Sequence, residues 1–448
     1  MKTSTLFTCR NCAYQASKWV GLCPQCDEWN TFEEEVVNKK TKKAAATLKS
    51  HAREPESFDA VLNSVALDMR TKTHISELDT VLGGGVVAGS VMLLTGEPGI
   101  GKSTLTLQIA QSMSRVGKQV LYVSGEESQQ QIALRGKRLG LELKNLRLLS
   151  ETNLETVIAS AEQHGCDFLI IDSIQVMASE VIPAQQGSVS QVRLCTEVLM
   201  EYAKPRQMPV LIIGHVTKDG TLAGPRVLEH LVDTVLYLEG DRTHEHRMLR
   251  ASKNRYGSAQ EVGIFQMTET GLNEVSDATR YFISERPSHG IGSALTVTME
   301  GNRPLLLEVQ ALVSQTSFGY PRRTANGFDV NRLHMLIAVL QKYTKVNLSN
   351  HDVFVNVVSG YKLHDPQADL AVCAALISSF QKKSLADDVV YVGEVGLSGE
   401  IRGKGKNRKQ LESLLKKTGI RLSPIAKHIT EATLGSLRHK TCINKRTC

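Results

Sequence analysis

Short apolar runs, each ending at a polar residue, recur along the first two thirds of the chain. They begin at Val91, Val120, Phe168 and Val210, and segments with helical spacing of apolar residues separate them. Such runs are typical of buried strands, and strands that alternate with helices form parallel sheets. The pattern predicts an α/β domain whose site lies at the carboxyl ends of its strands.

A different pattern begins near Ser284. The stretches 294–300 and 305–313 alternate in polarity on either side of Gly301-Asn302, which is typical of a β-hairpin. Beyond the hairpin we predict two helices and two strands, over 330–343 and 368–380 and over 353–358 and 389–395. These elements predict a second, separate α/β domain.

A glycine-rich turn lies between the run that begins at Val91 and a helical segment. It reads Gly96-x4-Gly101-Lys102-Ser103, the context that a phosphate-binding P-loop requires, and this agreement disfavours an ordinary glycine turn. Backbone N–H groups and the helix N-terminus then face the phosphates. We expect Lys102 to reach the β- and γ-phosphates of ATP and Ser103 to bind Mg²⁺. The expected nucleotide-binding residues are Gly96, Glu97, Pro98, Gly99, Ile100, Gly101, Lys102, Ser103 and Thr104.

Acidic residues stand at the ends of two later strands. Asp172 ends the run that begins at Phe168 and has the place of a Walker B carboxylate, which holds Mg²⁺, here through water; a helix cap is the alternative. Glu126 follows another strand and is a candidate to orient or deprotonate the attacking water. Glu127 is its rival, and a merely capping pair is the third possibility.

Four cysteines open the chain as two CxxC pairs, Cys9 with Cys12 and Cys23 with Cys26. Two such pairs ten residues apart can place four thiolates around one tetrahedral Zn²⁺, and a redox dithiol is the alternative. The only two tryptophans flank the second pair, and we expect them to cover the metal site. A unit this small depends on the metal for its stability.

Two polar stretches and one basic motif are candidates for contacts with nucleic acid or nucleotide. The stretches 177–191 and 215–226 follow strand ends and could either contact nucleic acid or close the nucleotide site. The motif 253–257 is either a basic turn between two strands or a source of charge for a γ-phosphate. In the second case Lys253 and Arg255 would act on a neighbouring subunit, as an arginine finger does.

Length and composition limit the class of protein. A chain of 448 residues, with 41% hydrophobic and 22% charged residues, is typical of a globular protein of two to four domains. No apolar run approaches the roughly 20 residues that span a bilayer, and the first ten residues lack the apolar core of a signal peptide. We therefore expect a cytoplasmic protein with no membrane partner, whose nine cysteines are reduced or metal-bound.

Positive charge is concentrated near the C-terminus. Residues 401–448 hold thirteen lysines and arginines against two glutamates, a net charge of +11, so the preceding 400 residues carry a net −4 within the total of +7. The basicity of the whole chain is therefore weak evidence for nucleic-acid binding. A second basic stretch, 38–53, has few large apolar residues and is predicted to be a linker.

Taken together, the motifs resemble the RadA (Sms) family of bacterial DNA-repair ATPases over nearly the whole chain. Besides the P-loop, the resemblance rests on Lys18-Trp19-x-Gly21-x-Cys23-Pro24-x-Cys26, Val81-Leu-Gly-Gly-Gly85, Val123-Ser-Gly-Glu-Glu-Ser128, Lys253-Asn-Arg-Tyr-Gly257 and Gly393-Glu-Val-Gly-Leu-Ser-Gly-Glu400. The Lys-Asn-Arg-aromatic-Gly motif separates this family from other RecA-like ATPases that share the P-loop.

The resemblance implies a RecA-like ATPase that uses ATP and Mg²⁺ beside a zinc module and forms a homohexameric ring on single-stranded DNA. It also implies a role beside the RecA recombinase, extending or migrating branched DNA intermediates. By motif position, the catalytic residues are Lys102, Glu126, Asp172, Lys253 and Arg255. The last two belong to the motif that looks to the neighbouring subunit's nucleotide and to DNA. An ATP-dependent scaffold without motor activity is the alternative function.

The C-terminal part resembles the domain of Lon proteases, which suggests an ATP-dependent peptidase as a further hypothesis. Lon chemistry needs a nucleophilic serine activated by a lysine. Gln367 stands where that serine would be, so we expect no peptidase activity and a scaffold for oligomerisation and DNA contact instead. The family pattern stops after Arg402, and 403–448 are predicted to be a divergent basic tail. Its positive charge could aid DNA binding, and a solvated, partly disordered tail is the alternative.

The expected fold class is therefore α/β, with a RecA-like P-loop core built on a parallel sheet. A zinc-ribbon-like module precedes this core, and a Lon-protease-like α/β domain follows it. The predicted boundaries are a four-cysteine zinc finger over 1–32, a basic linker over 33–57, the ATPase domain over 58–280 and the peptidase-inactive domain over 281–448.

Overall fold

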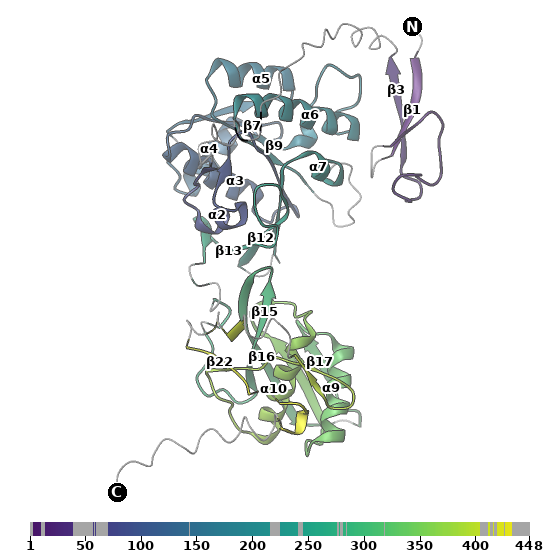
Figure 1. Cartoon of the computed structure of the whole chain (residues 1–448), viewed down its shortest axis with the longest axis vertical. Coiled ribbons are helices and arrows are strands. Elements are labelled where there is room, and N and C mark those ends of the chain that lie inside the picture. The colour runs from purple at the N-terminus through teal and green to yellow at the C-terminus, as the bar shows by residue number, and fades with distance from the viewer. Residues whose placement is uncertain are drawn as a thin grey trace. The chain divides into compact units, whose positions relative to one another are not determined.

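A computed structural model shows two compact units, Met1–Val275 and Ser276–Cys448 (Figure 1). It describes residues 3–9, 14–38, 57, 59, 70–142, 144–215, 225–240, 245–275, 277, 281–283, 285–317, 319–403, 411–412, 415, 419–424 and 426–431. Most of the predicted linker therefore lies outside the described residues. Within them, no helix combines the length and the apolar character that a bilayer crossing requires.

A nine-stranded sheet forms the centre of the first unit, in the order β14-β13-β12-β11-β6-β10-β9-β7-β8. The six strands from β11 to β8 in this order are parallel. They are β6 (Val91–Gly96), β7 (Val120–Ser124), β8 (Leu146–Ser150), β9 (Phe168–Asp172), β10 (Val210–Ile213) and β11 (Thr234–Glu239). All four predicted strands are confirmed.

The predicted parallel sheet is nevertheless mixed. Three antiparallel strands extend it beyond β11, namely β12 (His246–Asn254), β13 (Val262–Thr268) and β14 (Gly271–Glu274). Short connections join these strands, whereas a parallel strand needs a long crossover, so the chain can only return antiparallel here. A two-stranded ribbon of β4 (Arg70–Thr71) and β5 (Val86–Val87) precedes β6.

Helices cover both faces of this sheet (Figure 1). Side chains of α2 (Ser76–Leu82), α3 (Lys102–Arg115) and α4 (Gln129–Arg138) pack with Met92, Tyr122 and Ile170 on one face. Side chains of α5 (Leu154–Gln163), α6 (Val189–Arg206) and α7 (Pro225–Leu231) pack with the alternate strand positions on the other. Because successive strand side chains point to opposite faces, each strand contributes to both cores.

The second unit contains a six-stranded sheet in the order β17-β18-β16-β15-β19-β22. The strands are β15 (Ser293–Glu300), β16 (Arg303–Gln315), β17 (Arg323–Asn326), β18 (His351–Val357), β19 (Val389–Val390) and β22 (Arg421–Leu422). The helices α9 (Val330–Tyr343) and α10 (Asp369–Gln381) agree closely with their predicted bounds. The predicted strand over 389–395 is wrong, because it breaks into β19 and β20 (Glu394–Val395), and β20 pairs with β21 (Ile401–Arg402) instead.

Part of the predicted divergent tail belongs to the folded core. Leu411, Leu415 and Ile420 are buried beside Val390, and β22 pairs with β19. The tail is therefore not simply a solvated basic segment, because Leu411, Leu415 and Ile420 pack into one face of the sheet. Residues 404–410 and 432–448 lie outside the described residues.

Candidate functional site

The P-loop connects β6 to α3 through backbone that only glycine accommodates. Gly96 has a φ of 151°, and a Cβ there would lie 2.3 Å from the Leu238 carbonyl oxygen. Gly101, at a φ of 115°, is the N-cap residue of α3, and no side chain caps this helix. The first backbone N–H groups of α3 are therefore available to an anion such as the phosphates of ATP. This geometry fits the predicted P-loop.

Lys102 is the first residue of α3 and is buried. Its ammonium donates hydrogen bonds to the carbonyls of Gly96 (2.8 Å) and Glu97 (3.0 Å). Burial lowers the pKa of Lys102 to about 8, although the nearby carboxylates of Asp172 and Glu126 favour the charged form. The ammonium is thus held inside the loop, where phosphate oxygens would be its natural partners.

Asp172 ends β9 opposite Ser124, the last residue of β7. Its carboxylate is buried and accepts a 2.6 Å hydrogen bond from the Tyr122 hydroxyl. Burial raises the pKa of Asp172, and hydrogen bonds from Tyr122 and Ser103 oppose that rise. Ser103 and Asp172 therefore meet at one point, and a hydroxyl beside a carboxylate is an oxygen donor set that fits Mg²⁺ held partly through water.

The two candidate glutamates after β7 have different surroundings. Glu126 accepts a hydrogen bond from the Ser173 hydroxyl and lies 3.6 Å from Nε2 of His215. Its carboxylate also influences the pKa of Lys102 and of Asp172, so it belongs to the same cluster. Glu127 instead forms an ion pair with Arg135 of α4. Of the two glutamates, therefore, Glu126 is the one whose charge acts on Lys102 and Asp172.

Sequence reasoning missed three residues around this cluster. His215 follows β10, and its pKa is lowered by burial and by Lys102, against the attraction of Glu126 and Asp172. Tyr122 holds Asp172, and Arg247 of β12 donates a 3.1 Å hydrogen bond to the Ile100 carbonyl in the P-loop. Only His215 had a signal, as the polar residue at a strand end. The other two sit within strands, where nothing in the sequence distinguishes them.

The basic motif 253–257 lies at the opposite end of the strands from the P-loop. Lys253 pairs with Val235 of β11, and Val235 pairs with Leu93 of β6, whereas Gly96 pairs with Leu238 further along. Because β6 and β11 are parallel, the motif lies toward the amino ends of these strands. Lys253 is still within β12, and 255–257 begin the turn that leads to β13, so the reading of a basic turn between two strands holds for the second half of the motif. Lys253 and Arg255 are thus not brought together with Lys102.

Both cations of this motif have partners within the chain. The Lys253 ammonium donates to the Glu229 and His230 carbonyls at the end of α7 (2.7 and 3.2 Å). The guanidinium of Arg255 bonds Oδ1 of the buried Asp233 at 3.1 Å, while half of the Arg255 side chain stays exposed. The motif therefore has a structural role that does not require a second subunit.

The two polar stretches differ in what the structure describes. Within 177–191, the buried amide of Gln191 accepts a bond from the Ser179 backbone N–H and donates to the carbonyls of Ser179, Ile182 and Ala184. One side chain thus fixes the path of this loop. Most of the second stretch, 216–224, lies outside the described residues.

Three of the four predicted zinc ligands converge in the N-terminal module. This module is a three-stranded sheet of β1 (Thr3–Cys9), β2 (Gln15–Ala16) and β3 (Phe32–Asn38). The Sγ atoms of Cys9, Cys23 and Cys26 lie within 4.8 Å of one another, and those of Cys9 and Cys26 are 3.7 Å apart. Zinc–sulfur bonds of about 2.3 Å in a tetrahedron place sulfurs about 3.8 Å apart, so these thiolates fit Zn²⁺. Cys12 lies outside the described residues.

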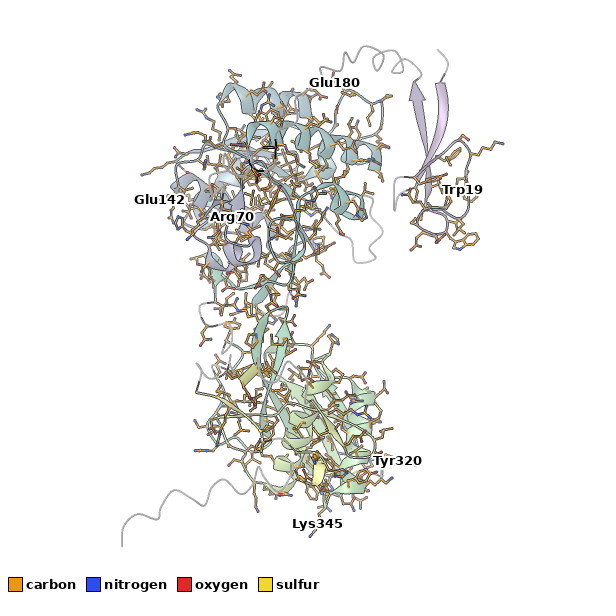
Figure 2. The ribbon with its side chains drawn as sticks, viewed as in Figure 1. Trp19, Arg70, Glu142, Glu180, Tyr320 and Lys345 are labelled. Atoms are coloured by element: carbon orange, nitrogen blue, oxygen red, sulfur yellow. The ribbon has the colours of Figure 1, made fainter. Side chains whose placement is uncertain are left out.

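The two tryptophans do not cover this site, contrary to expectation. Trp19 and Trp29 are 55% and 68% exposed, and both rings lie close to Gly21 (Figure 2 labels Trp19). Phe7 and Phe32 pack against the cysteines instead. The strand residues reach the cysteines because Cys9 pairs directly with Phe32 across the sheet.

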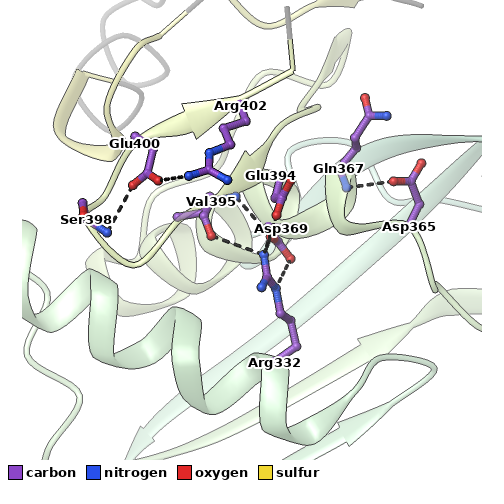
Figure 3. Close-up of polar contacts among 9 residues, drawn as sticks. All are labelled: Arg332, Asp365, Gln367, Asp369, Glu394, Val395, Ser398, Glu400 and Arg402. Atoms are coloured by element: carbon purple, nitrogen blue, oxygen red, sulfur yellow. Dashed lines mark hydrogen bonds and ion pairs between the residues drawn. The ribbon is translucent and has the colours of Figure 1, made fainter. Parts of the chain in front are cut away.

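Gln367, which we expected at the position of a Lon-type serine, lies in the short helix η4 (Pro366–Ala368) (Figure 3). Beside it, the fully buried Asp369 is engaged by the guanidinium of Arg332 and by the Val395 backbone N–H at 3.1 Å. The Gln367 backbone N–H bonds the Asp365 carboxylate at 2.9 Å. The residues drawn around Gln367 in Figure 3 include no serine–lysine pair, and they tie α9, α10 and β20 together.

Comparisons with known proteins agree with the P-loop site and the cysteine module. Residues 55–221 match a family described as an AAA domain, and residues 7–34 match a rubredoxin metal binding domain. The chain is 45% identical over 417 residues to "DNA repair protein RadA" of Bacillus subtilis, covering 93% of this chain and 91% of that protein. Proteins of the same name from Streptococcus pyogenes and Listeria monocytogenes are 49% and 44% identical, covering 90% and 93% of this chain and 88% and 90% of theirs.

Proposed function

Because the chain belongs to the RadA family of DNA repair proteins, we propose that it is a DNA-dependent ATPase that acts in homologous recombination. In this proposal it works as a homohexameric motor on single-stranded DNA and processes branched intermediates together with the RecA recombinase. The observation that carries the proposal is the cluster of Lys102, Asp172 and Glu126 at the carboxyl ends of neighbouring strands.

The chemistry follows from this cluster. The Lys102 ammonium and the first N–H groups of α3 would bind the β- and γ-phosphates and stabilise negative charge that develops during transfer. Mg²⁺ bound with ATP would neutralise phosphate charge beside Ser103 and Asp172. Glu126, which Ser173 and His215 orient, would take the proton of the attacking water.

A hexamer would explain the position of the basic motif. Lys253 and Arg255 lie at the end of the strands opposite to their own P-loop, so any nucleotide that they contact would belong to a neighbouring subunit. The exposed half of Arg255 is the part that could reach across. Such a contact from a neighbour stabilises the transition state of phosphoryl transfer and makes hydrolysis depend on assembly.

The first test is the rate of ATP hydrolysis by the zinc-loaded protein, with and without single-stranded DNA, at two salt concentrations. Stimulation by DNA that weakens with salt would support a motor, because phosphate contacts release counterions. ATP binding with no stimulation would favour the alternative, an ATP-dependent assembly scaffold. Only cleavage of a peptide substrate would support the peptidase hypothesis. We expect none, because the Gln367 side chain has no oxygen that can act as a nucleophile in peptide cleavage.

A further inference from the structure

A pocket on the sheet of the second unit belongs to none of the sites described above. Its volume is about 270 Å³, and the loop before β15 and the strands β15, β16 and β18 line it. Pockets for drug-sized ligands have volumes of about 300–1,000 Å³. This pocket is slightly below that range and has room for one long side chain.

The rim of the pocket is apolar and exposed. Alternation along β16 places Leu306, Glu308 and Leu312 on one face of the sheet. Leu306 is buried under Leu411 and Leu415, but this cover stops before Leu312, which is 60% exposed. Ile291, from the loop before β15, is 57% exposed, so two large apolar side chains form the rim.

A buried carboxylate also lines the pocket. Glu308 is only 2% exposed, and its Oε1 accepts hydrogen bonds from the Ser293 hydroxyl (2.6 Å) and the Gln310 amide (3.2 Å). The guanidinium of Arg286 lies 3.9 Å from the same oxygen and bonds Ser293 directly. Among the described residues no group bonds Oε2, and Glu308 lines the pocket, so Oε2 is the oxygen available to a ligand there.

These features define the ligand chemistry. An unpaired oxygen of a buried carboxylate costs free energy that a hydrogen-bond donor recovers, and a cationic donor recovers more. A guanidinium prefers both oxygens of a carboxylate, and Oε1 is already bonded, so a single free oxygen favours an ammonium. The apolar rim suits a methylene stem, and lysine combines such a stem with an ammonium.

We propose that the Glu308 pocket binds the side chain of a lysine presented by a partner protein. The lysine stem lies between Ile291 and Leu312, and its ammonium bonds Oε2 of Glu308. All residues that line the pocket belong to the second compact unit, whereas the P-loop cluster belongs to the first.

The test uses the full-length, zinc-loaded protein and the tripeptide acetyl-Gly-Lys-Gly-amide as the probe, titrated by ligand-observed NMR. We expect saturable binding that weakens with salt, and about tenfold or greater weakening when the probe's ammonium is acetylated. Glu308→Gln should weaken binding of the unmodified probe to the same extent. Glu285→Gln, which removes an exposed charge from the preceding loop, should leave it unchanged.

Leu312→Ala provides an independent variant if Glu308→Gln does not fold, because this exposed side chain contributes little to stability. It should weaken the probe severalfold without removing the charge. Equal affinity for the acetylated probe, or unchanged affinity in both pocket variants, would overturn the proposal. Tighter binding of free 1,5-diaminopentane than of the peptide would also overturn it, by assigning the pocket to a small diamine.

Discussion

The assignment of Glu126 as the general base leads to a test that compares two adjacent residues. Glu126→Gln keeps the size of the side chain and an oxygen that can accept the Ser173 hydrogen bond, but an amide cannot take a proton from water. General base catalysis contributes about 10²–10⁴ in rate, equivalent to about 2.7–5.4 kcal/mol of activation free energy. We expect kcat to fall by this factor.

Nucleotide affinity should separate this effect from a binding defect. The variant removes a negative charge near Lys102, where the γ-phosphate would lie, so repulsion between two anions disappears. We therefore expect an equal or lower Kd for ATP in Glu126→Gln, together with an unchanged melting temperature. The assays are steady-state hydrolysis with DNA, fluorescent nucleotide titration and thermal unfolding.

The matched control is Glu127→Gln. This substitution breaks a partly exposed ion pair with Arg135, which is worth about 0–1 kcal/mol of stability, and leaves the cluster intact. Its kcat should stay within about twofold of the parent protein. A loss in Glu127→Gln as large as that in Glu126→Gln would refute the assignment, and so would a Glu126→Gln enzyme with full activity.

Other consequences of the structure can be checked in the same preparation. Lys102→Ala should lower hydrolysis by on the order of a hundredfold or more without lowering the melting temperature, because this ammonium is held by loop carbonyls rather than the core; parallel losses of activity and stability would contradict this. In the parent protein, nucleotide affinity measured in a pH titration should decline above about pH 8, where Lys102 loses the proton that attracts phosphate. The pKa of Lys102 is lower in the folded than in the unfolded protein, so its deprotonation relieves a cost of burial, and the free energy of unfolding should not fall as the pH rises. Tyr122→Phe should raise the Mg²⁺ concentration needed for nucleotide binding severalfold, and Tyr237→Phe, which loses a similar tyrosine–carboxylate bond to Glu229, should not. Because both tryptophans lie in the zinc module, a chelator should change the intrinsic fluorescence while basal hydrolysis without DNA persists, and a fluorescence unchanged after zinc release would contradict a metal-dependent fold.

The sequence by itself determined the local chemistry of this protein. Apolar runs with polar ends identified the four strands around the site, because burial on both faces requires uninterrupted apolar residues. The P-loop and the cysteine pairs were equally local, since spacing alone places their ligand atoms. These features need no knowledge of distant residues.

The tertiary structure alone decided which side chains meet. Glu126 and Glu127 are equivalent in sequence, and only the packing of α4 brings Arg135 to one of them. Tyr122 reaches Asp172 because β7 and β9 are neighbours, although 50 residues separate them along the chain.

Pairing between strands also corrected expectations that local patterns could not test. The stretch 389–395 is apolar enough for one strand, but its two halves find different partners, β22 and β21. The charge of the basic tail favoured a solvated segment, yet Leu411 and Leu415 pack against strands β15 and β16, which lie about 100 residues earlier in the chain. A pattern records what a segment can bury, whereas the fold decides against which surface it is buried.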